Sequence, residues 1–276
     1  MFRSSFAVVL TAFGALSMTG ASANAAVAGG LVPHRAVYDI ELKQASDRSG
    51  IEGMRGRMVY EFSGSECAGY TTNFRFVTRI DTGEQVRVTD QQSFTFEDLA
   101  KGKFRFETKS FTDDQLDKDV SGAAADENGK VKIELSEPAK RAVELADSRF
   151  PAEHMLEVID NARKGRTFFE ARIFDGSEDG DKSYLTTTIV GPERKPVTTE
   201  SKDKASEALA GTAYWPVSIA YYDEKAVGDV LPIYTQSFKL YENGITQDLT
   251  LDYGDFILSG KLTNLEVLGS GDCKPR

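Results

Sequence analysis

The sequence has few of the residues that bind metals or carry redox chemistry. Its 276 residues include only 2 His, 2 Cys and 1 Trp. Zinc, iron–sulfur and haem centres are built from Cys and His, so we expect no resident metal centre or other cofactor. Basic residues are also outnumbered, since 33 Lys and Arg face 43 Asp and Glu and the formal net charge is -10. This balance argues against a nucleic-acid partner, because phosphate binding needs a basic face.

Long hydrophobic runs are missing beyond the N-terminus. Arg3 precedes an apolar stretch at residues 6–16, and small residues that fit the A-x-A cleavage rule follow at residues 21–28. This pattern predicts a secretory signal peptide at residues 1–28, with an N-terminal membrane anchor as the less favoured alternative. Its removal leaves 276 - 28 = 248 residues with a charge of 32 - 43 = -11. We therefore expect residues 29–276 to be exported and soluble.

The two cysteines, Cys67 and Cys273, lie 273 - 67 = 206 positions apart. In an oxidising compartment a disulfide is their natural pairing, while two free thiols or an intermolecular bond remain the alternatives. No C-x-x-C motif is present, so the expected bond is a structural staple rather than a redox centre. In the chain-entropy model, closing a loop of this length stabilises a fold by up to about 5 kcal/mol.

The rest of the chain is rich in residues that alternate with a period of two. Tyr38, Ile40 and Leu42 alternate with charged residues, which is typical of a strand with one buried and one wet face. The same period recurs, with aromatic residues on the apolar side, at Met54–Phe62, Tyr70–Ile80, Phe94–Phe96 and Phe104–Phe106. Asn128-Gly129 and Asn243-Gly244 predict two-residue hairpin turns. The pattern favours a mainly β fold with a single large curved antiparallel sheet or barrel in one domain.

Helical signals are scarce. Pro151 suits the first position of a helix that we expect to run to Arg163 and to end near Gly165. A second short helix is predicted at Pro216–Tyr222, and Ser201–Ala210 is a weaker third candidate. The expected fold therefore contains one or two short helices.

One acidic segment resembles part of a calcium-binding loop. Residues 175–181 match the first seven positions of an EF-hand, with candidate ligands Asp175, Ser177, Asp179 and Asp181. The twelfth position is Thr186, where that loop needs a bidentate Glu, and the flanking segments read as strands. We therefore favour an acidic turn between strands at Thr167–Phe174 and Tyr184–Val190, and expect no metal site.

Enzyme signatures are weak. His154 follows Glu153, but neighbouring residues on a helix point about 100° apart, so a buried structural His is the favoured interpretation. A G-x-S-x-G nucleophile motif is absent from the sequence. Hydrolase chemistry based on carboxylates alone stays open.

The densest aromatic segment begins at Trp215 and ends at Tyr222. We interpret it as core packing against a curved sheet. The functional alternative is the wall or lid of an apolar groove, with Trp215, Ile219 and Tyr222 as its candidate residues.

Several motifs together resemble one family, the cell-envelope integrity EipB family of alphaproteobacteria. The motifs are His34–Asp39, Phe150-Pro151-x-x-His154, Phe174–Ser177 and Trp215-Pro216 followed by Tyr221-Tyr222. The resemblance covers essentially the whole chain after the signal peptide. It implies a periplasmic protein with a spiral-like, incompletely closed β-barrel and a disulfide, which by position would join Cys67 and Cys273. It also implies a role in envelope homeostasis and stress resistance, and it offers no catalytic residues to carry over.

We therefore predict a non-enzymatic periplasmic protein that supports envelope integrity by binding a protein partner or an envelope component. The negative charge argues against simple adsorption to anionic membranes and for a specific partner. The alternative is a carrier or chaperone for lipids or lipidated ligands held in an apolar concave groove. A hydrolase is the least favoured hypothesis.

Overall fold

The computed structural model describes residues 30–195, 208–209, 211–225 and 231–269. Within them, 14 strands form one antiparallel sheet in the order β8-β7-β6-β5-β4-β3-β2-β1-β14-β13-β12-β11-β10-β9. The first eight strands are β1 (His34–Ala45), β2 (Gly53–Ser65), β3 (Gly69–Asp81), β4 (Val86–Asp98), β5 (Lys103–Thr112), β6 (Gln115–Asp126), β7 (Lys130–Glu137) and β8 (Arg141–Ala146). After helix α1 (Pro151–Arg163) come β9 (Phe168–Ile173), β10 (Tyr184–Val190), β11 (Tyr214–Asp223), β12 (Tyr234–Tyr241), β13 (Thr246–Asp252) and β14 (Phe256–Val267). Two short 3₁₀ turns, η1 (Asp47–Ser49) and η2 (Leu99–Lys101), lie between strands.

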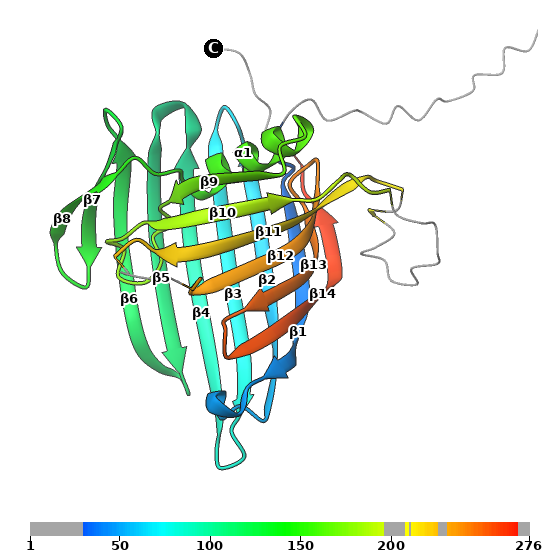
Figure 1. The fold of residues 1–276 in the computed structure, drawn as a ribbon. Helices are drawn as coiled ribbons and strands as arrows, with labels where there is room; N and C mark the ends of the chain where they lie inside the picture. The colour runs from blue at the N-terminus through cyan, green and yellow to red at the C-terminus, as the bar shows by residue number, and fades with distance from the viewer. Residues whose placement is uncertain (1–29, 196–207, 210, 226–230, 270–276) are drawn as a thin grey trace, which may run out of the picture.

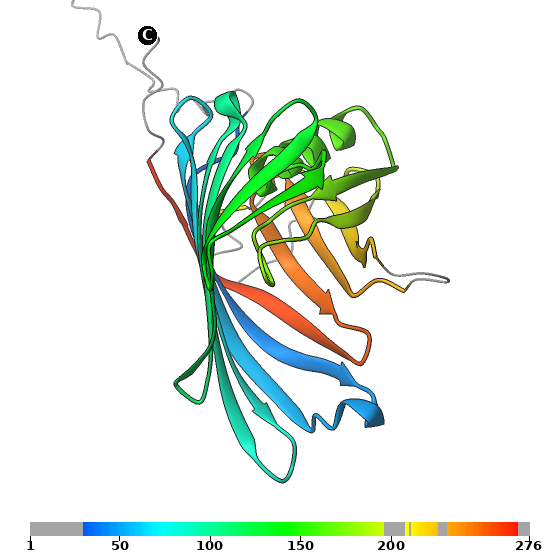
Figure 2. The same cartoon turned by 90° about the vertical axis from the view of Figure 1, so that its left-hand side faces the viewer.

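The sheet is a meander that starts at its centre. Strands β1 to β8 run to one edge, and after α1 the chain returns from the other edge until β14 pairs with β1. In Figure 1 the shorter strands β9 to β13 cross in front of the long strands β2 to β6. Figure 2 shows the two halves facing each other across an interior. The edges β8 and β9 do not pair within the described residues, so the barrel is incompletely closed, as the family resemblance implied.

Helix α1 follows the last strand of the first half and precedes the first strand of the second. Its predicted limits, Pro151 and Arg163, are confirmed. Its apolar face is buried, with Val158, Ile159 and Ala162 in the main core. Among the described residues, no helix is both long and apolar enough to cross a membrane.

The helix predicted at Pro216–Tyr222 is wrong, because these residues belong to strand β11. Trp215, Val217 and Ile219 are buried at alternate positions, which is the strand period. Pro216 is tolerated because it lies near the start of β11, before the pairing with β10 begins at Val217. The weaker helical candidate, Ser201–Ala210, lies mostly outside the described residues.

Both predicted hairpins are present, but only one has the predicted turn. Asn128 and Gly129 have φ angles of 57° and 74°, as the two-residue turn between β6 and β7 requires. Between β12 and β13 only Gly244 has a positive φ, and its N–H donates to Tyr241 O at 2.9 Å. That loop therefore has three residues, a type I turn followed by a left-handed glycine.

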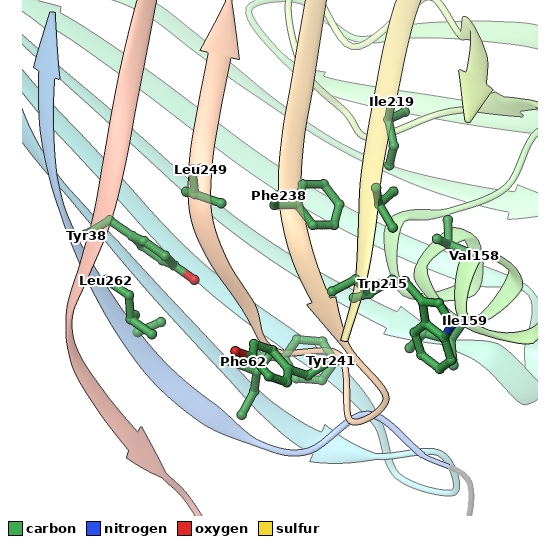
Figure 3. Packing of buried hydrophobic residues seen from close by; sticks show 14 of the residues in the cluster. Tyr38, Phe62, Val158, Ile159, Trp215, Ile219, Phe238, Tyr241, Leu249 and Leu262 are labelled. Atoms are coloured by element: carbon green, nitrogen blue, oxygen red, sulfur yellow. The ribbon is translucent and has the colours of Figure 1, made fainter. Parts of the chain in front are cut away.

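The buried apolar residues in the described part of the chain form two clusters. The larger one joins both halves of the sheet to α1, and Figure 3 shows Val158 and Ile159 of the helix close to Trp215 of β11. The smaller cluster lies under β5 to β8 and centres on Phe104. The ring of Phe104 stacks on Phe150 at 5.0 Å between centroids and meets Phe174 edge-on at 6.0 Å. Phe150 directly precedes α1, and Phe174 begins the β9–β10 loop. This cluster therefore packs the helix and the loop against the long strands.

Candidate functional site

A cavity of about 360 Å³ lies inside the open barrel. It is bounded by β1 to β4 on one side, by β11 to β13 on the other and by the first turn of α1. Its lining is predominantly apolar and aromatic, and the aromatic members are Tyr38, Tyr60, Phe62, Tyr70, Phe74, Phe76, Tyr221, Tyr234, Phe238 and Tyr253. Such a lining with a small number of polar groups is typical of small-molecule sites.

The polar wall of the cavity is strand β4. Gln91, Thr95 and Glu97 line the cavity, whereas Phe94 is 43% exposed on the opposite face. The alternation predicted for this strand is confirmed. The polar residues face the interior, however, where the sequence pattern predicted the phenylalanines. The register explains the reversal, because Glu97 pairs with Tyr70 of β3 and directly paired residues share a face.

Glu97 caps α1 from a distant strand. Its two carboxylate oxygens accept the N–H groups of Ala152 and Glu153 at 2.7 and 2.8 Å. The helix needs this partner because Phe150, at the N-cap position, makes no side-chain cap. Glu97 is 3% exposed, and burial raises its pKa to about 7 although the two N–H donors oppose the shift.

His154 lies on the same turn of α1 and lines the cavity. It is 5% exposed, and its Nε2 atom has no hydrogen-bond partner in the described part of the chain. Burial, with a smaller effect from the Arg149 cation, lowers the pKa of His154 to about 4. The imidazole is therefore neutral at physiological pH and carries a buried polar atom with unused hydrogen-bonding capacity. The expected partly buried structural His is confirmed as buried, but its ring adds a polar group to the cavity.

The three carboxylates among the four candidate ligands of the acidic loop have separate partners. Asp175 lines the cavity and accepts the N–H of Ser177 at 2.9 Å. Asp179 pairs with Lys118 at 3.3 Å, and Asp181 pairs with Arg141 at 2.8 Å. The carboxylates thus serve different partners, and no group of three or more metal-ligating side chains occurs among the described residues. The segment is the β9–β10 connection, as the favoured interpretation had it.

The aromatic segment of β11 contributes two residues to the wall. Ile219 lines the cavity, but Trp215 packs in the core beside it and Tyr222 lies on the opposite face of the strand. Tyr221 takes the place expected for Tyr222. In a strand, residues 219 and 221 share a face, whereas the helical interpretation had put residues 219 and 222 on one face.

A row of tyrosines leads from this wall to the surface. The rings of Tyr221 and Tyr234 are 5.5 Å apart between centroids, and those of Tyr234 and Tyr253 are 4.9 Å apart. Tyr253, in the β13–β14 turn, is 38% exposed. Tyrosine suits such a row, since its ring packs on apolar groups while its hydroxyl tolerates water.

Cys67 lies in the turn between β2 and β3, with Sγ 3.4 Å from Ser65 Oγ. The described part of the chain holds no free cysteine. Cys273 lies outside the described residues, so its pairing with Cys67 stays a prediction.

Sequence reasoning missed Glu97 because its neighbours Phe94 and Phe96 marked the other face of β4 as the buried one. A signal for Glu97 existed only indirectly, in the absence of a polar N-cap at Phe150. His154 and Asp175 were both considered, but for other roles.

Comparison with known proteins agrees with this architecture. The family model described as EipB-like matches residues 25–269. This chain belongs to the EipB-like family. One member, the cell envelope integrity protein EipB of Brucella abortus (strain 2308), is 49% identical over 254 residues, which cover 92% of this chain and 90% of that protein.

A solved structure of the family is also similar. It is a crystal structure from Brucella abortus, described as a β-barrel-like protein of a domain of unknown function. The TM-score is 0.82 at 48% sequence identity, over 88% of this chain and all of the other. The predicted family and the mainly β, incompletely closed fold are therefore confirmed.

Proposed function

We propose that this protein is a non-enzymatic periplasmic protein that supports envelope integrity and resistance to envelope stress. In this proposal residues 1–28 direct export and residues 29–276 form one domain, stapled by Cys67 and Cys273. The name of the Brucella relative supports the envelope role. Its mode of action, in this proposal, is to hold the apolar chain of an envelope component.

The observation that carries this mode of action is the cavity of about 360 Å³. Its volume lies within the about 300–1,000 Å³ of typical small-molecule sites. A core filled by its own side chains would leave no such space, since interiors pack at crystal-like density. The tyrosine row that ends at Tyr253 supports a route for an apolar chain between the surface and the cavity.

Binding is a better interpretation of the polar wall than catalysis. Both oxygens of Glu97 are engaged in capping α1, and His154 Nε2 has no acid or base bonded to it among the described residues. A nucleophile activated by a neighbouring base needs such a hydrogen-bonded pair. The hydrolase hypothesis requires that alanine at His154 or Asp175 abolishes function in a folded protein.

A protein partner is the second candidate, and one surface feature favours it. Phe168 and Ile189 form a cross-strand pair on β9 and β10, and each is 57% exposed. Because β9 is an edge of the sheet, an exposed apolar pair there suits an interaction with another chain.

The test is to block the cavity from one strand. Gln236 of β12 lines the cavity, and its neighbour Thr235 points to the other face. We expect Gln236→Trp to fill the cavity and to fail to restore detergent resistance to cells that lack the gene. Thr235→Trp, the matched control, restores it, and both variants unfold at temperatures close to that of the wild type.

Full complementation by a folded Gln236→Trp variant contradicts cavity binding. If Phe168→Asp abolishes complementation in the same assay while Gln236→Trp retains it, the exposed β9–β10 pair is the functional surface and the second candidate is favoured.

A further inference from the structure

The charges of the cavity lining all have one sign. The described residues that line it include two carboxylates, Glu97 and Asp175, and two imidazoles, His34 and His154, but no Lys or Arg. A buried anion needs a cation or several hydrogen-bond donors to offset its desolvation. The described lining supplies no such cation.

The two imidazoles do not fill this role. Burial lowers the pKa of both His34 and His154, so both rings are neutral at physiological pH. His34 Nδ1 donates to Val32 O at 2.7 Å, because a carbonyl can only accept. His154 Nε2 is the atom left without a partner among the described residues.

The cation whose charge acts on His154 is engaged in ion pairs. Arg149 lies 3.3 to 3.7 Å from carboxylate oxygens of Asp147, Glu153 and Glu157. Three carboxylates around one guanidinium leave no positive charge to attract an anion into the cavity.

Burial raises the pKa of both carboxyls, Glu97 and Asp175, so the cavity disfavours negative charge even on its own side chains. Burial is the main cause of the raised pKa values of Tyr184 and Tyr221, and the Asp175 carboxylate adds to both shifts. Burial likewise raises the pKa values of Tyr60 and Tyr70, with a smaller contribution from Glu97. A ligand anion in the cavity would bear the same cost of desolvation, with added repulsion from any ionised carboxylate.

The size of the cavity limits the apolar part of the ligand. About 360 Å³ lies near the lower end of the about 300–1,000 Å³ range of ligand pockets. This volume suits one acyl chain better than two.

We infer that the cavity binds a single acyl chain with an uncharged, hydrogen-bonding head, an ester or amide of the monoacylglycerol type, and discriminates against carboxylate and phosphate heads. This inference rests on the proposed function, because it names the ligand class of the same cavity. The head bonds to His154 Nε2. A head with both a hydroxyl and a carbonyl satisfies either tautomer of the ring.

The experiment is a displacement titration on the delipidated mature protein at neutral pH. The uncharged fluorophore N-phenyl-1-naphthylamine is displaced with monomyristoylglycerol, myristate or myristoyl lysophosphatidate, which share one acyl chain. We expect monomyristoylglycerol to bind at least about tenfold more tightly than either anion. His154→Phe keeps a ring of similar shape and removes the polar atom, so it weakens the binding of monomyristoylglycerol about tenfold and that of the fluorophore much less.

Asp175→Asn is the matched variant for charge, because its amide oxygen can still accept the Ser177 N–H. It strengthens the binding of myristate several-fold, so the preference of the protein for monomyristoylglycerol over myristate narrows. Equal or tighter binding of myristate by the wild type overturns the inference while cavity binding stands. If neither the fluorophore nor any amphiphile binds, the proposed function itself fails.

Discussion

Two ionisable residues at the first turn of α1 have pKa values displaced in opposite directions. The pKa of Glu97 rises from 4.5 to about 7, and that of His154 falls from 6.5 to about 4. Both shifts arise mainly from burial, which disfavours the charged form of each group. Between pH 4.5 and 7 the folded protein therefore holds a proton on Glu97 that the unfolded chain releases. Between pH 4 and 6.5 it lacks a proton on His154 that the unfolded chain binds.

These shifts predict opposing pH dependences of the free energy of unfolding. Between pH 4.5 and 7 the contribution of Glu97 falls as pH rises. Between pH 6.5 and 4 the contribution of His154 is lost as pH falls. We expect His154→Gln to gain up to about 3 kcal/mol relative to the wild type as pH falls through this window. Urea unfolding at a series of pH values measures the difference.

Glu97→Gln is the mirror control for this measurement. It loses part of the cap on α1 and should cost about 1–2 kcal/mol. The difference in unfolding free energy between this variant and the wild type shrinks as pH rises from 4.5 to 7. Only the wild type has the raised carboxyl pKa, so only the wild type loses stability over this range. Parallel stability curves for the wild type and His154→Gln would refute the assigned pKa shift.

Among the elements, the β9–β10 connection packs closely against the long strands, and a glycine allows this close approach. Gly176 has a φ of 71°, and a Cβ there would overlap the ring of Phe106 in β5. Gly129, in the β6–β7 turn, has a similar φ of 74° but open space around it. The loop that carries Asp175 therefore depends on close backbone approach, not only on backbone conformation.

We expect Gly176→Ala to destabilise the protein by about 1–3 kcal/mol more than Gly129→Ala. Both variants bear the cost of a left-handed residue, about 1–2 kcal/mol, and only the first adds overpacking. Thermal unfolding of the two variants measures this difference. Equal losses would mean that the loop moves away from Phe106 without cost.

The elements also show where sequence reasoning succeeds. The limits of α1 and the Asn128-Gly129 turn follow from local chemistry, namely a proline at the first helical position and two residues that tolerate positive φ. On β11 the choice between helix and strand failed, since a short aromatic segment carries both periods. On β4 the alternation was correct, but which face is buried depends on pairing with β3, and that is not a local property.

At the scale of the whole molecule, the predicted disulfide would tie the C-terminal tail to the β2–β3 hairpin. Cys67 and Cys273 are separated by 273 - 67 = 206 positions. We expect Cys67→Ser to lower the free energy of unfolding by about 2–5 kcal/mol, because the unfolded chain regains the entropy of a long loop. Urea unfolding of the oxidised wild type and the variant measures the loss.

Thiol labelling of the denatured, unreduced mature protein supplies the independent check. Neither cysteine should react before reduction, and both should react after it. Labelling of both without reductant would rule out the bond, whatever the stability of the variant.

The strand period, the limits of α1, the acidic charge and the family follow from the sequence alone, because each depends on neighbouring residues or on motifs in order. The arrangement of Glu97, His154 and Asp175 around one cavity depends instead on the tertiary fold. They come from β4, α1 and the β9–β10 loop, which meet because the sheet curls and brings its second half across the first. Curvature and register arise from pairing between distant strands, so the polar wall of the cavity could not be assigned from local pattern alone.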